Sequence, residues 1–244
     1  MNKVLGISGS FHKNSNTDTL IETVMEATGA EYELIKLSSV KVGYCTGCKK
    51  CVQTHECVRN DDFKWISKEM LDADAIILGS PVRCNTVTAI TKTFIERWNS
   101  FIHVETHPLR DKLAAGVVIG WTGIESTSEW LKRVALEGMG GMNVVGTVTA
   151  QGYHGSFTCG NGETCPRSAW NLGKKIEMMM NQDIGIKKMC EGRVEALPDN
   201  DPLTNPSYKI LDSSYVSVKD QPEAMQKAEE IGKIIPAKLQ NNVV

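Results

Sequence analysis

Four cysteines are concentrated in one short segment of the chain, and thiols at this density indicate metal chemistry. The four are Cys45, Cys48, Cys51 and Cys57, spaced C-x2-C-x2-C-x5-C. Two-residue gaps followed by a short loop allow the four sulfurs to converge on one point. A cubane [4Fe–4S] cluster requires this arrangement, with one thiolate for each iron. Lys49 and Lys50 lie between the ligands, where their charge would offset that of a thiolate-bound cluster.

Three other interpretations of these cysteines stay open. A structural zinc site also uses four thiolates, but such sites usually divide them into two separated C-x2-C pairs. Disulfides are disfavoured because nothing else in the chain points to export. Chance alone rarely places four unpaired thiols so close together. The spacing also differs from the bacterial ferredoxin run, which has three residues before its last cysteine and a proline after it; here Val58 follows.

The loop after the first apolar run, residues 6–17, is rich in groups that bind anions. Its hydroxyl and amide side chains belong to Ser8, Ser10, Asn14, Ser15, Asn16 and Thr17. Together with backbone N–H groups at the start of a helix, they would surround a phosphomonoester. Neither G-x-G-x-x-G nor G-x4-G-K-[ST] is present, which argues against a Rossmann NAD site and an ATP site. A polar turn with an ordinary capping box is the alternative interpretation.

Two further loops could line a flat heterocycle. The first is the run Leu78-Gly-Ser-Pro-Val-Arg-Cys-Asn-Thr-Val87, whose backbone N–H and C=O groups could meet the edge of a ring. The second, Ile119-Gly-Trp-Thr-Gly123, offers glycine for close approach and Trp121 to cover a ring face. All three loops follow predicted strands, so we expect them to meet at one edge of a sheet.

Short apolar runs alternate with amphipathic segments over residues 1–150, which is the pattern of an α/β fold with an open parallel sheet. The five predicted strands are Val4–Ser8, Tyr32–Leu37, Ala75–Gly79, Ala114–Gly120 and Asn143–Ala150. We predict a flavodoxin-like sheet of order 2-1-3-4-5 with helices on both faces. The cysteine loop would directly follow the second strand.

Helices are predicted between these strands from the spacing of apolar residues. Three of them are Thr17–Ala27, Thr88–Trp98 and Glu125–Leu136. A fourth lies between the second and third strands; Asp61 or Asp62 would cap it, and it would bury Phe63, Ile66, Met70 and Leu71. After the last strand we predict a loop over Gln151–Arg167, which contains Cys159 and Cys165, and then a helix over Ala169–Glu191, which contains Cys190. An exposed connection over Leu197–Tyr208 follows. The last predicted helix is Pro222–Leu239, interrupted near Pro236. Residues 1–195 would form one domain, and residues 196–244 a C-terminal extension.

Length and composition exclude several classes of protein. With 244 residues and a net charge of −2, the chain gives no electrostatic reason to bind nucleic acid. No apolar run approaches the ~20 residues of a membrane-spanning helix, and the N-terminal apolar stretch is too short for a signal peptide. Eight cysteines without an export signal predict a cytoplasmic protein whose thiols hold metal or do redox chemistry.

Taken together, the Gly6-Ile-Ser-Gly-Ser10 and Lys13-Asn-Ser-Asn-Thr17 segments, Gly79-Ser-Pro-Val82 and the cysteine motif resemble the iron–sulfur flavoprotein family, within the NADPH-dependent FMN reductase and flavodoxin-like group. The resemblance covers residues 1–150 and implies FMN and one [4Fe–4S] cluster per subunit of a homodimer or homotetramer. Carried over by position, the FMN phosphate contacts are Ser8, Ser10, Asn16 and Thr17, and we add His12 and Asn14 of the same loop as cofactor contacts. The corresponding ring contacts are Pro81, Val82, Arg83, Cys84, Asn85, Thr86, Val87, Trp121, Thr122 and Gly123.

The chain departs from the family pattern beside the expected flavin. Phe11-His12 stands where Pro-Arg is usual, so a phosphate-facing guanidinium would be replaced by imidazole or lost. Arg83 and Cys84 stand where an aromatic side chain is usual. A cation there would stabilise reduced, anionic flavin; the alternative is that Arg83 faces solvent.

The resemblance implies a flavin-dependent oxidoreductase. A one-electron carrier such as ferredoxin would reduce the cluster, and electrons would pass through FMN to a small-molecule acceptor such as a quinone, dioxygen or peroxide. No side-chain base or nucleophile is needed for this chemistry. One alternative is an NAD(P)H-dependent FMN or quinone reductase with structural zinc in the cysteine loop. A second is a redox-sensing binding protein.

Overall fold

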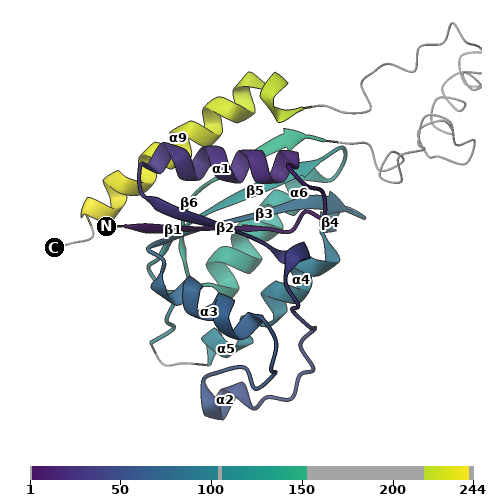
Figure 1. Cartoon of the computed structure of the whole chain (residues 1–244), viewed down its shortest axis with the longest axis vertical. Coiled ribbons are helices and arrows are strands. Elements are labelled where there is room, and N and C mark those ends of the chain that lie inside the picture. The colour runs from purple at the N-terminus through teal and green to yellow at the C-terminus, as the bar shows by residue number, and fades with distance from the viewer. Residues whose placement is uncertain (1, 104–105, 153–216, 242–244) are drawn as a thin grey trace, which may run out of the picture. The chain divides into compact units, whose positions relative to one another are not determined.

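The computed structural model describes residues 2–103, 106–152 and 217–241, which contain a parallel sheet with helices on both faces (Figure 1). The strand order is β2-β1-β3-β5-β6, and β4 pairs with the end of β3. The parallel strands are β1 (Lys3–Ser8), β2 (Glu31–Lys36), β3 (Ala75–Arg83), β5 (Leu113–Gly120) and β6 (Asn143–Gln151). Counted along the chain without β4, this is the predicted order 2-1-3-4-5, so the flavodoxin-like fold class is confirmed.

Continuous apolar sequence produces the central strands of this sheet. β5 is buried along its whole length, as expected for a parallel strand covered on both faces. The strand predicted to stop at Gly79 continues as β3 to Arg83 and then turns back into β4, Thr86–Val87. The sequence did not predict β4, because so short a strand carries little periodic signal.

Helix α1, Asn16–Thr28, begins and ends with strong local signals. The Ser15 hydroxyl accepts a hydrogen bond from the Asp18 N–H, and the Asp18 carboxylate accepts one from the Ser15 N–H. This pair is a capping box. Gly29 ends the helix in a left-handed conformation. The apolar face that packs on the sheet comprises Leu20, Ile21, Val24 and Met25.

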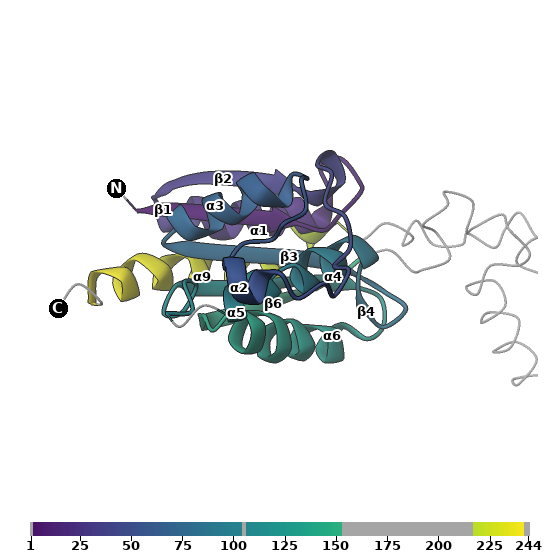
Figure 2. The ribbon, with the colours of Figure 1, turned by 90° about the horizontal axis from the view of Figure 1, so that it is seen from below.

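Other helical segments cover the opposite face of the sheet (Figure 2). They are α3 (Phe63–Asp72), α4 (Ala89–Glu96), α5 (Asn99–Ile102) and α6 (Ile124–Trp130), which continues as a π-helix over Leu131–Met139. The predicted helix Thr88–Trp98 is confirmed over α4, but it ends at Glu96. The N–H groups of Arg97 and Trp98 donate to carbonyls three residues earlier, those of Phe94 and Ile95, so the helix tightens into a turn before α5.

Of the two residues predicted to cap α3 the structure selects Asp61, and one predicted buried position of the helix is wrong. In the described chain Asp62 makes no side-chain capping bond; its carboxylate instead accepts the Lys41 N–H at 2.6 Å. Asp61 is the residue that accepts the Phe63 N–H, at 3.2 Å. Leu71 was expected on the buried face but is 38% exposed, because it lies at the edge of a narrow apolar stripe.

Helix α9, Pro222–Asn241, lies beside α1 on the same face of the sheet (Figure 1). A short 3-10 turn, Val218–Asp220, precedes it. Gly232 allows the two helices to approach closely, because a Cβ at this position would lie 2.4 Å from the Val24 carbonyl oxygen. The last helix therefore contributes directly to the hydrophobic core.

The interruption predicted near Pro236 is wrong. The helix continues through Pro236 to Asn241, because burial of the adjacent Ile235 side chain offsets the loss of one backbone hydrogen bond. Residues Met1–Gly152 and Ser217–Val244 form one compact unit. Several predictions fall outside the described residues: the domain boundary at 195/196, the loop beyond Gly152, the helix Ala169–Glu191, the connection Leu197–Tyr208, and Cys159, Cys165 and Cys190.

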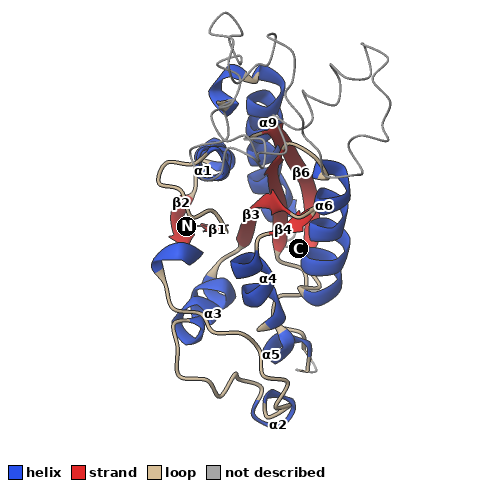
Figure 3. Ribbon diagram, turned by 90° about the vertical axis from the view of Figure 1, so that its right-hand side faces the viewer, coloured by secondary structure: helices blue, strands red, loops and turns tan. Residues whose placement is uncertain are grey.

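Helices lie on both sides of the sheet (Figure 3), and a hydrophobic cluster fills the space on each side. One joins α1 and α9 to the strands, and the other joins α3, α4 and the π-helix to them. The second contains aromatic rings packed edge to face: Phe63 lies 5.7 Å from Phe94, and Phe94 lies 5.8 Å from Trp98, between ring centroids. Cys57 packs against this cluster, so the end of the cysteine loop is anchored on the hydrophobic core.

A search of the described helices for membrane spans found none with the length and apolar character needed to cross a bilayer.

Candidate functional site

The loops after β1 and β3 meet at the carboxyl edge of the sheet, as predicted. The Gly9 N–H donates to the Gly79 carbonyl at 2.8 Å. The Thr88 hydroxyl donates to the Gly9 carbonyl at 3.0 Å, and the Thr88 N–H donates to the Ser80 hydroxyl at 3.0 Å. The start of α4 is therefore held against both loops.

The end of β3 forms a tight hairpin with β4. Residues 82–83 pair with residues 86–87, which leaves Cys84 and Asn85 as the turn. Both have positive φ, 49° and 57°, a conformation that costs a typical non-glycine residue about 1–2 kcal/mol and less for asparagine. Such turns suit the twist of a two-residue hairpin. Backbone strain of this kind is concentrated at binding sites.

Asn85 and Gly123 bring the hairpin against the loop after β5. The Thr122 hydroxyl donates to Asn85 Oδ1 at 3.3 Å. Gly123 has a φ of +67°, and a Cβ there would lie 2.7 Å from Asn85 Oδ1. Only glycine permits both the conformation and the approach. The three predicted loops thus adjoin one another along a single edge of the sheet.

The residues predicted to line a ring differ in exposure. Arg83, Cys84, Asn85, Thr86 and Thr122 are exposed, whereas Pro81, Val82, Trp121 and Gly123 are half-buried. Val87 is only 2% exposed, and its side chain belongs to the core. It could therefore offer only backbone groups to a bound ring.

Polar side chains of the loop after β1 bond first to one another. The Ser8 hydroxyl donates to the Asp18 carboxylate at 2.6 Å and accepts the Ser10 N–H at 3.3 Å. The Lys36 ammonium contacts the same carboxylate and donates to the His12 carbonyl at 2.6 Å. Lys36 and Asp18 thus form an ion pair beside the loop, and together they add no net charge there.

The predicted cofactor contacts of this loop fall into two groups by exposure. Ser8, Ser10, Asn16 and Thr17 are buried, whereas His12 and Asn14 are exposed. Asn16 Oδ1 accepts the Val218 N–H at 3.2 Å, so this side chain also joins α1 to the segment before α9. The first turn of α1 adds backbone N–H groups, which attract anions.

The four predicted ligand cysteines line one pocket. Its lining comprises Cys45, Thr46, Cys48, Lys49, Cys51, Cys57, Val58, Arg59, Arg97, Asn99 and Ser100. Helix α2, Cys51–Thr54, is a single turn, and Gly47 and Lys49 have positive φ, so the chain winds tightly between the cysteines. Cys48 is exposed, and the other three thiols are half-buried.

The local environment shifts the pKa of two of these thiols. A hydrogen bond from the Lys50 backbone N–H lowers the pKa of Cys48. Burial, and next the neighbouring Cys57, raise the pKa of Cys51. Neighbouring thiols disfavour simultaneous ionisation, which a bound metal centre would offset.

A zinc ion and a cubane cluster place different requirements on the four cysteine sulfurs. Within the part of the chain that the structure describes, no three His, Cys, Asp or Glu side chains are grouped so that they could hold one metal ion. A zinc site needs its sulfurs about 2.3 Å from a single ion. In a cubane each thiolate binds a different iron, so the sulfurs stand farther apart.

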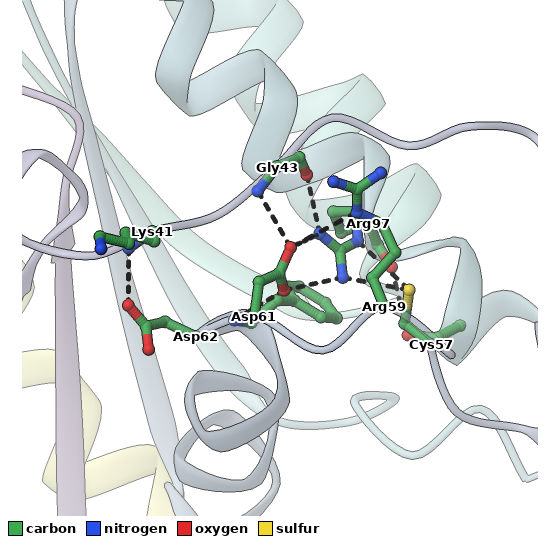
Figure 4. Close-up of polar contacts among 9 residues, drawn as sticks. Lys41, Gly43, Cys57, Arg59, Asp61, Asp62 and Arg97 are labelled. Atoms are coloured by element: carbon green, nitrogen blue, oxygen red, sulfur yellow. Dashed lines mark hydrogen bonds and ion pairs between the residues drawn. The ribbon is translucent and has the colours of Figure 1, made fainter.

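Arg97, directly after α4, is aimed at Cys57 and Asp61 (Figure 4). Its Nε and Nη2 atoms lie 3.3 and 3.1 Å from Cys57 Sγ. Nη1 and Nη2 donate to the Asp61 carboxylate at 2.7 and 3.0 Å, and Nη1 also donates to the Gly43 carbonyl at 2.7 Å. Arg97 is 2% exposed, and its guanidinium lies 4.7 Å from the Phe63 ring centroid. All three guanidinium nitrogens are thus engaged.

Asp61 closes the base of the cysteine loop. Its carboxylate also accepts the Gly43 N–H at 3.0 Å. Gly43 precedes the first ligand and Asp61 follows the last, so these bonds join the two ends of the loop. Burial alone raises the pKa of Asp61, but hydrogen bonds from Arg97 and Gly43 outweigh it and leave the pKa lowered. The pair is therefore ionised at neutral pH.

Comparison with known proteins agrees with this geometry. A family model described as NADPH-dependent FMN reductase matches residues 2–155. An iron–sulfur flavoprotein of Methanocaldococcus jannaschii is 33% identical over 187 residues, which cover 71% of this chain and 95% of that protein. The chain belongs to the iron–sulfur flavoproteins, within the NADPH-dependent FMN reductase family.

One further relative and one solved structure show how far the similarity extends. An iron–sulfur flavoprotein of Archaeoglobus fulgidus is 36% identical over 138 residues, which cover 54% of this chain but only 61% of that protein. A flavone reductase structure aligns with a TM-score of 0.55 at 18% identity, covering 96% of this chain and 62% of that one. The structural match supports the fold alone. The family is one of flavin-dependent oxidoreductases.

Sequence reasoning missed several polar partners in this iron–sulfur flavoprotein. Arg97 lies 40 residues from Cys57, and Lys36 lies 18 residues from Asp18, separations that no local motif records. One signal was available for Arg97. At helical spacing Arg97 falls on the same face as Phe94, Trp98 and Phe101, and a charge on an apolar face requires a buried partner.

Proposed function

We propose that this iron–sulfur flavoprotein carries FMN at the carboxyl edge of its sheet and a [4Fe–4S] cluster in its cysteine pocket. It would move electrons from a one-electron carrier such as ferredoxin to a small-molecule acceptor such as a quinone, dioxygen or peroxide. When bound, the cluster exchanges single electrons and FMN exchanges one or two, which is the chemistry needed between such partners.

One observation carries the proposal: the four thiols predicted as ligands line a single pocket. Lys49, Arg59 and Arg97 share that pocket, and Arg97 is paired with Asp61. The positive charge of these side chains complements an anionic thiolate centre. The chain's own role is to hold Cys45, Cys48, Cys51 and Cys57 on a closed loop.

The edge of the sheet supplies the second half of the proposal. The loop after β1 and the backbone N–H groups at the start of α1 would provide donors for the FMN phosphate. The strained hairpin at Cys84 and Asn85, together with Trp121 to Gly123, would contact the isoalloxazine ring. Arg83 is exposed at the same hairpin, where its charge would favour reduced flavin.

Exposure of the cysteine loop favours a protein electron donor. Cys48 is exposed, and Lys49 and Lys50 beside it are exposed as well. A carrier with an acidic surface could therefore approach the pocket directly. Assembly as a homodimer or homotetramer is part of the proposal and is measured by analytical ultracentrifugation.

The test is anaerobic reduction of the purified protein, followed by flavin absorbance in stopped flow. We expect reduced ferredoxin to bleach the flavin of the wild-type protein, and we expect Cys48→Ala, which retains FMN, to lose most of that rate. Equal rates in the two proteins would contradict electron entry through the cysteine pocket.

A second candidate is direct reduction of FMN by NADPH, which the name of the matching family model favours. In that case NADPH would bleach the flavin rapidly, and Cys48→Ala would bleach as fast as wild type. Metal analysis would then show zinc instead of iron. The same stopped-flow series distinguishes the two candidates.

A further inference from the structure

Arg97 makes more contacts than its role in closing the cysteine loop requires. Asp61 and the Gly43 carbonyl accept three of its hydrogen bonds, which already neutralises and anchors a buried guanidinium. Its Nε and Nη2 atoms also point at Cys57 Sγ, at 3.3 and 3.1 Å. This second pair of contacts converges on an atom that the proposed function makes a cluster ligand.

We propose that Arg97 raises the reduction potential of the cluster through these two N–H···S hydrogen bonds, with Asp61 as the residue that positions the guanidinium. The inference rests on the proposed function, in that it requires a cluster bound by the four cysteines. Hydrogen bonds to ligand sulfurs, net charge and solvent exposure are the protein's means of tuning such a centre.

The direction of the effect follows from charge. Reduction adds one electron, supplied by the one-electron carrier, and no covalent bond forms or breaks. The added negative charge is stabilised by a cation whose N–H groups touch the ligand sulfur directly. Because Arg97 is 2% exposed, water screens this interaction little. Asp61 lies on the other side of the guanidinium and therefore opposes the effect from a greater distance.

Arg59 provides a matched comparison within the same pocket. It also lines the pocket, and its Nε lies 3.5 Å from Asp61 Oδ2. In the described part of the chain, however, Arg59 makes no hydrogen bond to a cysteine sulfur. Replacing each arginine by lysine keeps both charges and removes the forked donor geometry. Only the Arg97 variant then loses paired donors to Cys57.

The first experiment is a spectroelectrochemical titration of the anaerobic holoprotein at fixed pH, with iron counted in each sample. For Arg97→Lys we expect a negative shift equivalent to about a tenfold change in the reduction equilibrium, ~59 mV for one electron. For Arg59→Lys we expect less than about a twofold change. A purely structural Arg97 would lower thermal stability in Arg97→Lys and leave the potential unchanged, which would overturn the inference.

A second variant covers the case in which Arg97→Lys fails to fold or to hold iron. Asp61→Asn removes the opposing negative charge but keeps one acceptor oxygen for the guanidinium, which the Gly43 carbonyl also holds at 2.7 Å, so we expect a positive shift. Unchanged potential in Asp61→Asn would overturn the inference while leaving the proposed function intact. Wild-type protein that binds FMN but no iron would overturn both. Thermal unfolding of the metal-free proteins separates loss of folding from loss of tuning.

Discussion

At the scale of single residues, the four pocket cysteines are distinguished from the exposed Cys84. Cys84 lies in the β3–β4 turn and does not line the cysteine pocket. We expect Cys48→Ala to lose the broad cluster absorbance in the visible while retaining FMN, because one ligand is removed and the fold is untouched. Cys84→Ala is the matched control and should keep both chromophores. Cluster loss in Cys84→Ala alone would contradict the assignment of ligands.

Asp61 gives a prediction about pH. Its lowered pKa means that the native state favours the ionised carboxylate, so its contribution to stability is present above the unfolded pKa of about 3.9 and is lost as pH falls through the lower native pKa. In metal-free protein at pH 7, we expect Asp61→Asn to lower the free energy of unfolding by roughly 2–3 kcal/mol, less than for a fully buried pair.

The difference between wild type and Asp61→Asn should therefore shrink as pH falls below about 4. Urea unfolding at a series of pH values measures it. Glu96, whose side chain is 42% exposed and pairs with Lys92, provides the control variant Glu96→Gln, for which the loss at pH 7 should stay within about 0.5 kcal/mol. A difference for Asp61→Asn that stays constant down to pH 2 would contradict the role of the Arg97 pair.

At the scale of elements, the contact between the β3–β4 hairpin and the loop after β5 can be tested at one glycine. Gly123 and Gly29 have nearly the same φ, +67° and +65°, but only Gly123 has a neighbour within 4 Å of its Cβ position. Alanine at either position should cost about 1–2 kcal/mol of backbone strain. Only Gly123→Ala should displace Asn85, so we expect it to weaken FMN binding about tenfold, a change of 1.4 kcal/mol.

Isothermal titration of FMN into the flavin-free proteins measures this difference. Equal affinities for Gly123→Ala and Gly29→Ala would mean that the hairpin does not contact the flavin.

Because α9 packs closely on α1, we expect alanine in place of Gly232 to lower stability, whereas the same replacement inside a helix usually raises it. Replacing glycine by alanine inside a helix ordinarily stabilises by about 0.5–1 kcal/mol. At Gly232 the added methyl would meet the Val24 carbonyl at 2.4 Å, so we expect Gly232→Ala to destabilise by about 1–3 kcal/mol. Thermal or urea unfolding measures it, with the exposed Glu229→Ala as control, expected within about 0.5 kcal/mol. Stabilisation by Gly232→Ala would refute the close helix contact.

At the scale of the whole molecule, the sheet could be predicted because each strand is encoded locally. β5, for example, is a continuous buried run that begins directly after Asp111 and Lys112, and strand order follows from the alternation of strands and helices. The cysteine motif was visible for the same reason. The hydrogen bonds of the Arg97 guanidinium could not be predicted, because its partners at residues 43, 57 and 61 are distant in sequence and are brought to it by tertiary packing.

Very short elements, and elements that depend on tertiary contacts, could not be predicted from the sequence either. The β4 strand is held by pairing with β3, and Pro236 stays helical because its neighbour Ile235 is buried. In both cases tertiary contacts override local preference. The residues that tune a site are therefore harder to predict than those that bind to it, since ligands cluster in sequence and their partners do not.

The central claim is that one pocket of this chain holds a cluster and one edge of its sheet holds FMN. The most direct measurement is a count of iron, zinc and FMN in anaerobically purified protein, together with its visible absorbance spectrum. The account predicts about four irons per chain, one FMN, no zinc and a broad absorbance shoulder beside the flavin bands. A colourless protein, or one with a single zinc and no iron, would contradict it.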